Sequence, residues 1–176
     1  PDPQTMPHPD ERTQMRRRDL AIGDDAEIKR ILEKAPYGFL ATSHEGQPFL
    51  RPCLFWYDPA SRRIYMHGAR RGRTPSNLAS NPRVCYGVAS MGRLLPADEA
   101  IEFSVEYESV IAFGTARLVT DAEEGRRALE GLMQKYFPDH RPGSDYRPIT
   151  PSELDQTAVY AIEVESWSGK RNPAMG

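Results

Sequence analysis

The sequence contains few cysteines and no long hydrophobic run. Its 176 residues include two cysteines, Cys53 and Cys85, and both lie in apolar, strand-like runs. Cysteines in such runs are typically small buried hydrophobic residues, so we expect free thiols and no disulfide framework. No stretch approaches the roughly 20 continuous apolar residues that a membrane helix requires, and residues 1–19 contain no apolar signal core. We therefore expect a soluble cytoplasmic protein with no membrane partner.

An excess of charge of one sign is also lacking. The net charge is −2 and the pI is about 6.1, whereas a general nucleic-acid binder has a basic footprint over its whole domain. The motifs G-x-S-x-G, H-E-x-x-H, C-x-x-C and G-x-G-x-x-G are absent as well. These absences argue against nucleic acid as a partner, a hydrolase nucleophile, a metal site and dinucleotide binding of the Rossmann type.

The composition indicates one globular domain that follows an arm. Apolar residues make up 39% and charged residues 27% of the chain, which is long enough to bury a sizeable core. Residues 1–22 are rich in proline and include Arg16, Arg17 and Arg18, so we expect a flexible N-terminal arm and a domain over residues 23–176. In this domain Asp24, with Glu27 three residues later, predicts a capped helix that ends at Pro36.

Runs of apolar and β-branched residues predict six β-strands, at residues 37–42, 49–57, 63–67, 84–89, 109–119 and 158–167. Two further helices are expected. One begins at Thr74, with Thr74 as the capping hydroxyl and Pro75 at the first helical position; the other begins at Thr120, with Glu123 as its capping partner. Strands in mostly hairpin order with peripheral helices indicate a mainly β (α+β) fold with an antiparallel barrel.

The most informative segment is the strand-to-helix turn between Tyr65 and Leu78. A strand ends there, a glycine-containing loop with Arg70, Arg71 and Arg73 follows, and a helix begins. Helix N-termini offer unpaired N–H groups, and arginine offers planar pairs of donors, so together they favour a bound phosphate. The alternative is a solvated charged turn. The coincidence of glycine, arginine and a hydroxyl at one turn favours phosphate binding.

This segment also carries a resemblance to a known family. The run to Val84, IYMHGARRGRTPSNLASNPRV, resembles the phosphate-binding strand, loop and helix of the pyridoxamine 5′-phosphate oxidase-like FMN-binding proteins, which have a split β-barrel fold. The run from Arg51 to Leu54 resembles the strand that lies along the flavin ring in that superfamily. The runs from Tyr107 to Val110 and from Ser168 to Pro173 resemble the subgroup that includes the nitroimidazole-resistance proteins.

The resemblance implies a role for each matching residue. Arg73 would bind the FMN phosphate, and Thr74 stands where a lysine is common, so that Arg70 or Arg71 would supply the missing charge. Ser109 would contact the flavin of a second subunit, because family members are homodimers with FMN at the interface. The run Ser109–Phe113 is too apolar for an exposed strand, so we expect that subunit to cover it, with Val110 buried in the interface. The implied cofactor site as a whole comprises Arg51, Pro52, Cys53, Leu54, His67, Gly68, Ala69, Arg71, Arg73, Thr74, Ser109, Lys170 and Arg171.

The reaction class follows from the cofactor, because a flavin supplies the hydride or electron chemistry itself. We expect an FMN-dependent oxidoreductase acting on a small organic substrate, such as a nitroaromatic compound, with His67 as the candidate catalytic residue and a satisfied strand histidine as the alternative. FMN is expected rather than FAD because one phosphate-binding loop is visible. Two other classes stay open: a flavin- or haem-binding protein without turnover, and a DNA-associated regulatory domain that uses the basic arm.

Overall fold

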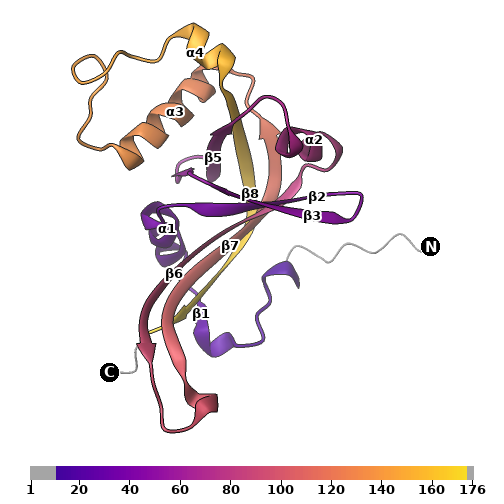
Figure 1. The fold of residues 1–176 in the computed structure, drawn as a ribbon, viewed down its shortest axis with the longest axis vertical. Helices are drawn as coiled ribbons and strands as arrows, with labels where there is room; N and C mark the ends of the chain where they lie inside the picture. Colours follow the sequence, from indigo (N-terminus) through magenta and orange to yellow (C-terminus); the bar gives the residue numbers. More distant parts are fainter. Residues whose placement is uncertain (1–10, 174–176) are drawn as a thin grey trace.

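The computed structural model of the chain describes residues 11–173. Its centre is one antiparallel sheet with the strand order β3-β2-β6-β7-β8-β5-β4, and β1 pairs with β8 beside this path. The sheet curls strongly, and β2 and β3 cross the long strands at a steep angle (Figure 1). It does not close, because β3 and β4 are edge strands. The mainly β fold of the split-barrel type is confirmed, with eight strands in place of the six expected.

Two strands are additional to the predicted ones. The run at residues 49–57 divides into two strands at Leu54 and Phe55, and β1 adds a short pairing near the N-terminus. The strands are β1 (Ala21–Ile22), β2 (Gly38–His44), β3 (Gln47–Cys53), β4 (Trp56–Asp58), β5 (Arg63–Gly68), β6 (Arg83–Leu95), β7 (Ser104–Leu118) and β8 (Ala158–Asn172). The α-helices are α1 (Asp25–Lys34), α2 (Arg73–Ser80), α3 (Ala122–Tyr136) and α4 (Pro151–Gln156).

Two predicted helix caps, those of α1 and α3, need correction. Asp24 caps α1 as expected, but Glu27 bonds to Arg30 and Arg171 instead of completing a capping box. The cap of α3 is Asp121, not Thr120, and its side chain accepts from the N–H of Glu124 at 2.7 Å. A carboxylate beside the hydroxyl is the stronger partner for a helix N-terminus, which shifts the start by one residue.

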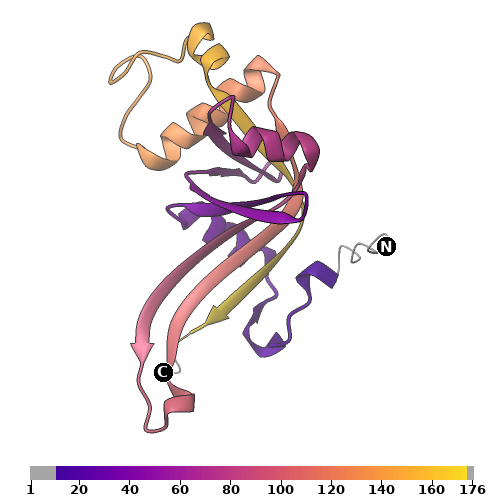
Figure 2. The ribbon, with the colours of Figure 1, turned by 45° about the vertical axis from the view of Figure 1, so that its right-hand side comes forward.

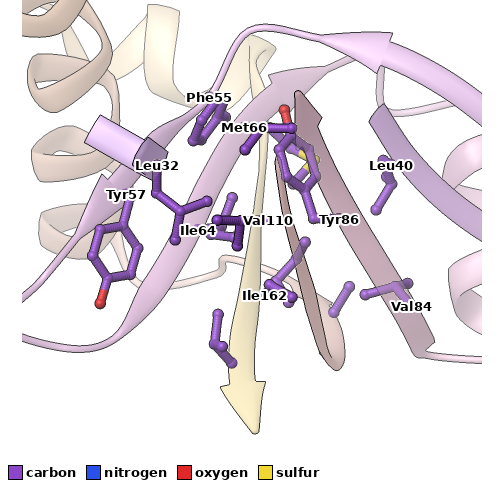
Figure 3. Packing of buried hydrophobic residues seen from close by; sticks show 14 of the residues in the cluster. Leu32, Leu40, Phe55, Tyr57, Ile64, Met66, Val84, Tyr86, Val110 and Ile162 are labelled. Carbon is purple, nitrogen blue, oxygen red and sulfur yellow. The ribbon is translucent and has the colours of Figure 1, made fainter. Parts of the chain in front are cut away.

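The core lies between α1 and the inner face of the curled sheet. Tyr86 of β6 and Ile162 of β8 meet there with Leu32 of α1 and with Phe55, which lies between β3 and β4 (Figure 3). Val110 of β7 belongs to this core and is 0% exposed. None of the helices formed by residues 11–173 is both long and apolar enough to cross a membrane.

Three strands continue well past this core. The lower halves of β6, β7 and β8 extend away from α2, α3 and α4, and the β6–β7 hairpin forms the far end of the molecule (Figure 2). We call this extension the hairpin arm; it comprises residues 90–108 and the end of β8. A register shift between Phe113 and Gly114 marks its root in the β7–β8 pair. A Cβ atom at Gly114 would lie 2.0 Å from the backbone oxygen of Glu163, so this bend requires glycine.

Residues 11–22, part of the predicted N-terminal arm, form two short 3-10 turns followed by β1. Arg12 of the first turn forms an ion pair with Glu165 at 2.9 Å, and its guanidinium lies 5.4 Å from the centre of the Phe113 ring. This segment therefore lies against the outer face of β7 and β8. The remainder of the predicted arm, residues 1–10, falls outside the described residues.

Candidate functional site

The predicted phosphate-binding turn is present between β5 and α2, with one correction. The N-cap of α2 is Gly72 and the helix begins at Arg73, so Thr74 is not the capping hydroxyl; it is buried in the first turn. Gly72 has a φ of +124°, a conformation that side chains rarely adopt, and this explains the earlier start. No side chain caps α2. Its first N–H groups are therefore available to a ligand.

Three hydrogen bonds between side chains attach α2 to β2. Asn77 donates to Thr42 at 2.9 Å in a buried contact, and Asn81 donates to Ser43 at 2.9 Å. His44 Nδ1 lies 2.8 Å from Ser80 Oγ. These bonds attach the middle and the C-terminal end of α2, and so fix the helix beside the β2–β3 hairpin (Figure 2).

The three arginines of the turn have different surroundings. Arg70 donates to the backbone oxygens of Leu154 and Thr157, at 3.4 and 3.5 Å, and so contacts the end of α4. Arg71 and Arg73 have no carboxylate partner within residues 11–173; Arg73 lies 5.3 Å from the centre of the Phe49 ring. Two cations without counter-ions beside an uncapped helix are suited to an anion.

The loop before these arginines is held from both sides. Tyr160 donates to the backbone oxygen of Ala69 at 2.8 Å, and Arg51 donates to that of His67 at 2.9 Å. A Cβ atom at Gly68 would lie 2.9 Å from Arg51 Nη1, so the guanidinium sits directly on this glycine. Arg51 thus connects the edge strand β3 to the end of β5. The His67 side chain is exposed at the same place.

The strand predicted to lie along the flavin ring is the edge strand β3. Pro52 and Leu54 are exposed, and β3 pairs only with β2 in the described part of the chain, which leaves half of its backbone groups free for a ligand. Cys53 points inward instead, with its sulfur 3.7 Å from the Tyr86 hydroxyl and 3.9 Å from Met66 Sδ. Burial raises the pKa of the Cys53 thiol, so it is an unreactive core group.

The remaining predicted residues lie at the other end of the sheet. Gly68 pairs with Ala158 at the start of β8, whereas Ser109 pairs with Lys170, twelve residues further along that strand. At about 3.3 Å per residue this is about 40 Å along the strand. Arg171 bonds to Glu27 at 2.5 Å and to Glu108 at 3.3 Å, so its charge is already balanced. One chain does not bring all thirteen predicted residues into one site.

An exposed apolar face connects these two ends. The sheet register places Phe39, Gly87 and Ile111 in one row, and Leu50, Ala41, Cys85 and Phe113 in the next. Phe39 is 38%, Leu50 59% and Ile111 37% exposed. Ser109 and Lys170 continue the same face, which we call the outer apolar face. Apolar faces of this kind on a sheet usually mark an interaction surface.

Sequence reasoning missed a groove beside the phosphate-binding turn. This cavity of about 470 Å³ lies between the β2–β3 hairpin and α2, and its lining residues are His44, Gln47, Phe49, Gly72, Arg73, Ser76 and Asn77. No local pattern predicts the groove, because its two walls lie far apart in the chain and meet only in the folded sheet.

The family comparison agrees with this geometry. The sequence profile described as pyridoxamine 5′-phosphate oxidase matches residues 24–171, most of the chain. No curated protein sequence matches significantly. The matched span includes β3, the arginine turn, the outer apolar face and the end of β8.

Several solved structures share the fold. The flavocytochrome Anf3 from Azotobacter vinelandii is 28% identical with a TM-score of 0.81, over 93% of this chain and 75% of that one. A candidate 5-nitroimidazole antibiotic resistance protein from Bacteroides thetaiotaomicron is 25% identical with a TM-score of 0.72, over 86% of each chain. The FAD and haem binding protein from Mycobacterium smegmatis, 21% identical over 88% of this chain and 74% of that one, has a TM-score of 0.79.

Proposed function

Because the chain belongs to the pyridoxamine 5′-phosphate oxidase family, we propose that it is a flavoprotein that holds FMN by its phosphate at the start of α2. The observation that carries this proposal is the pair of arginines, Arg71 and Arg73, that have no carboxylate partner among the described residues beside a helix without a side-chain cap. Here a dianionic phosphate provides the missing charge.

The residues at the site would hold FMN from three elements of the fold. Arg71, Arg73 and the first N–H groups of α2 would bind the phosphate, and the loop fixed by Arg51 and Tyr160 would contact the ribityl chain. The free backbone edge of β3 offers donors and acceptors to the ring. Flavins supply hydride and electron transfer, so the protein contributes binding, orientation and exclusion of water. The proposed reaction is reduction of a small organic acceptor such as a nitroaromatic compound, with His67 at the rim as the candidate proton donor.

The active unit in this proposal is a homodimer formed through the outer apolar face. Ser109 and Lys170 lie about 40 Å along β8 from the arginine turn of their own chain, so a second copy is needed to bring them to a flavin. Phe39, Leu50 and Ile111 supply the apolar contact area. A two-fold interface uses the same patch on both copies and creates two equivalent sites.

A haem-binding protein on the same fold is the second candidate. It is favoured by the similarity to a flavocytochrome and to an FAD and haem binding protein. The exposed His67 at the end of β5 offers an imidazole as an axial ligand.

The absorbance spectrum of the purified protein tests both candidates. Flavin bands, or saturable quenching of flavin fluorescence when FMN is titrated into a colourless preparation, support the flavoprotein. A Soret band that disappears in a His67→Ala variant supports haem. A colourless protein that binds neither FMN nor haemin contradicts both proposals.

A further inference from the structure

We propose that a second cavity, between α2 and the end of β7, binds a small monocarboxylate with an apolar body. Its volume of about 300 Å³ is at the lower end of the range of small-molecule sites, so it suits a ligand of about one ring. Pro75, Leu78 and Ala79 of α2 line this cavity, whereas Arg73 lies on the opposite side of the helix, in the groove at the β2–β3 hairpin. The α2–β7 cavity is therefore separate from the proposed flavin phosphate site.

The floor of the α2–β7 cavity is part of the apolar core. Leu78, Ala116 and Tyr160 line it, and these residues are only 8%, 4% and 2% exposed. The Tyr160 hydroxyl already donates to the backbone oxygen of Ala69 at 2.8 Å, so it needs no partner from a ligand. A floor of this kind offers water few hydrogen bonds and favours the apolar body of a ligand.

The charge of the lining indicates the other part of the ligand. Two arginines line the cavity, and none of the lining residues is acidic. Arg117 forms ion pairs with Glu124 at 2.7 Å and with Glu163 at 3.1 Å, so its charge is balanced. Arg70 has no carboxylate partner among residues 11–173. One unbalanced cation beside an apolar floor suits a ligand with a single negative charge.

The present contacts of Arg70 leave it available to a carboxylate. Its guanidinium donates to the backbone oxygens of Leu154 and Thr157 at 3.4 and 3.5 Å, which is long for a hydrogen bond of this type. A carboxylate accepts two parallel, charge-assisted hydrogen bonds from a guanidinium and is the stronger partner. We therefore assign Arg70 to the α2–β7 cavity, whereas Arg71 and Arg73 remain with the proposed flavin phosphate.

The test is a calorimetric titration of the purified full chain with benzoate, which combines one ring with one carboxylate. We expect benzoate to bind saturably. Benzamide has the same ring without the charge, and it should bind at least about tenfold more weakly because it loses the charge-assisted pair with Arg70. Acetate keeps the charge without the ring, and it should also bind at least about tenfold more weakly because it covers little of the apolar floor.

Three variants locate the bound benzoate. Arg70→Gln removes the unbalanced charge, and Ala79→Phe places a ring from the exposed rim into the cavity without a change of charge. Arg126→Gln is the matched control, because Arg126 also donates to a backbone oxygen, that of Ile149 at 2.7 Å, but does not line the cavity. We expect both cavity variants to weaken benzoate at least about tenfold and the control to change its affinity by no more than about twofold.

The proposal is overturned if benzoate does not bind the wild type, if benzamide binds as tightly as benzoate, or if neither cavity variant weakens benzoate. A competition titration provides a further test. Saturating FMN should leave benzoate bound, because the two sites use different arginines. Displacement of benzoate by FMN would assign Arg70 to the flavin phosphate and overturn the proposal. Absence of FMN binding with benzoate binding intact would contradict the flavin proposal alone.

Discussion

Replacement of Arg73 by alanine is the sharpest test of the phosphate-binding turn. Arg73 begins α2, has no carboxylate partner among residues 11–173 and contacts only the Phe49 ring through its charge. Loss of this arginine therefore breaks no ion pair that the structure describes. A loss of FMN affinity in the Arg73→Ala variant can therefore be distinguished from a loss of folding stability.

The two effects differ in size. A hydrogen bond to a charged group contributes about 1.5–3 kcal/mol, which corresponds to a roughly tenfold to 140-fold loss of FMN affinity at about 1.4 kcal/mol per decade. The lost cation–π contact with Phe49 is worth about 0.5–1 kcal/mol at an exposed site. For a chain of this length it lowers the melting temperature of the flavin-free protein by about 1–4 °C.

Quenching of flavin fluorescence measures the affinity, and thermal unfolding of the flavin-free protein measures the stability. Arg147→Ala is the matched control, because Arg147 pairs with Glu153 on the exposed side of α4 and carries the same charge. We expect this control to change FMN affinity by no more than twofold. An Arg73→Ala variant that binds FMN as tightly as the control would refute the assignment of the phosphate to the start of α2.

Three further predictions concern other parts of the molecule. Ile111→Asp places a charge on the outer apolar face, so dimer and flavin should be lost together in sedimentation with flavin absorbance; a monomer with wild-type FMN affinity would contradict the interface site. Gly72→Ala forces a side chain into a φ of +124°, which should cost about 1–3 kcal/mol in thermal unfolding and weaken FMN; an unchanged melting temperature would argue against the strained cap. Hydrogen bonds from Arg117 and Tyr65 lower the pKa of Glu124 below its ordinary value of 4.5. The stability it contributes is complete above pH 4.5 and is lost as the pH falls through its lowered pKa, so Glu124→Gln should unfold more easily at neutral pH and show a smaller loss between pH 5 and pH 3; an unchanged acid profile would contradict this.

The structure also corrects an expectation from the sequence about this strand. The apolar run Ser109–Phe113 was expected to be covered by a second subunit, with Val110 as its buried contact. In the structure Val110 belongs to the core of its own chain and Ile111 faces outward. Alternation along a strand predicts which residues share a face. It does not predict which face turns toward the core when, as here, both faces of the run carry apolar side chains.

Regular patterns predicted most of the fold. All six predicted strands and three predicted helices are present, because alternation, capping residues and proline stops are local signals. The helix α4 was missed although Thr150, Pro151 and Glu153 form a complete capping box, since it follows a long irregular loop. The extensions of β6 and β7 were missed for a different reason. Residues 90–95 and 104–108 alternate poorly, and their strand conformation depends on pairing with each other.

Local sequence signals predicted only part of the candidate site. Arg73 and Gly72 belong to one short segment, so their neighbourhood follows from the sequence. The groove, and the distance between Gly68 and Lys170, depend on how β2, β3 and β8 cross in the sheet. Contacts between distant segments of this kind carry no local pattern.

β6 and β7 run from the core into the hairpin arm, and this limits how the length of the hairpin arm can vary. Successive side chains of a strand point to opposite faces of the sheet. Removal of one residue from β6 or β7 inside the hairpin arm would therefore move every side chain beyond the deletion to the opposite face. Removal of two residues from each strand leaves every remaining side chain on its own face of the sheet and shortens the hairpin arm by about 7 Å. Insertions and deletions within the paired strand segments, residues 90–95 and 104–108, are therefore expected in balanced pairs. Relatives in which this extension differs in length would be related by such paired steps, with the rest of the sheet unchanged.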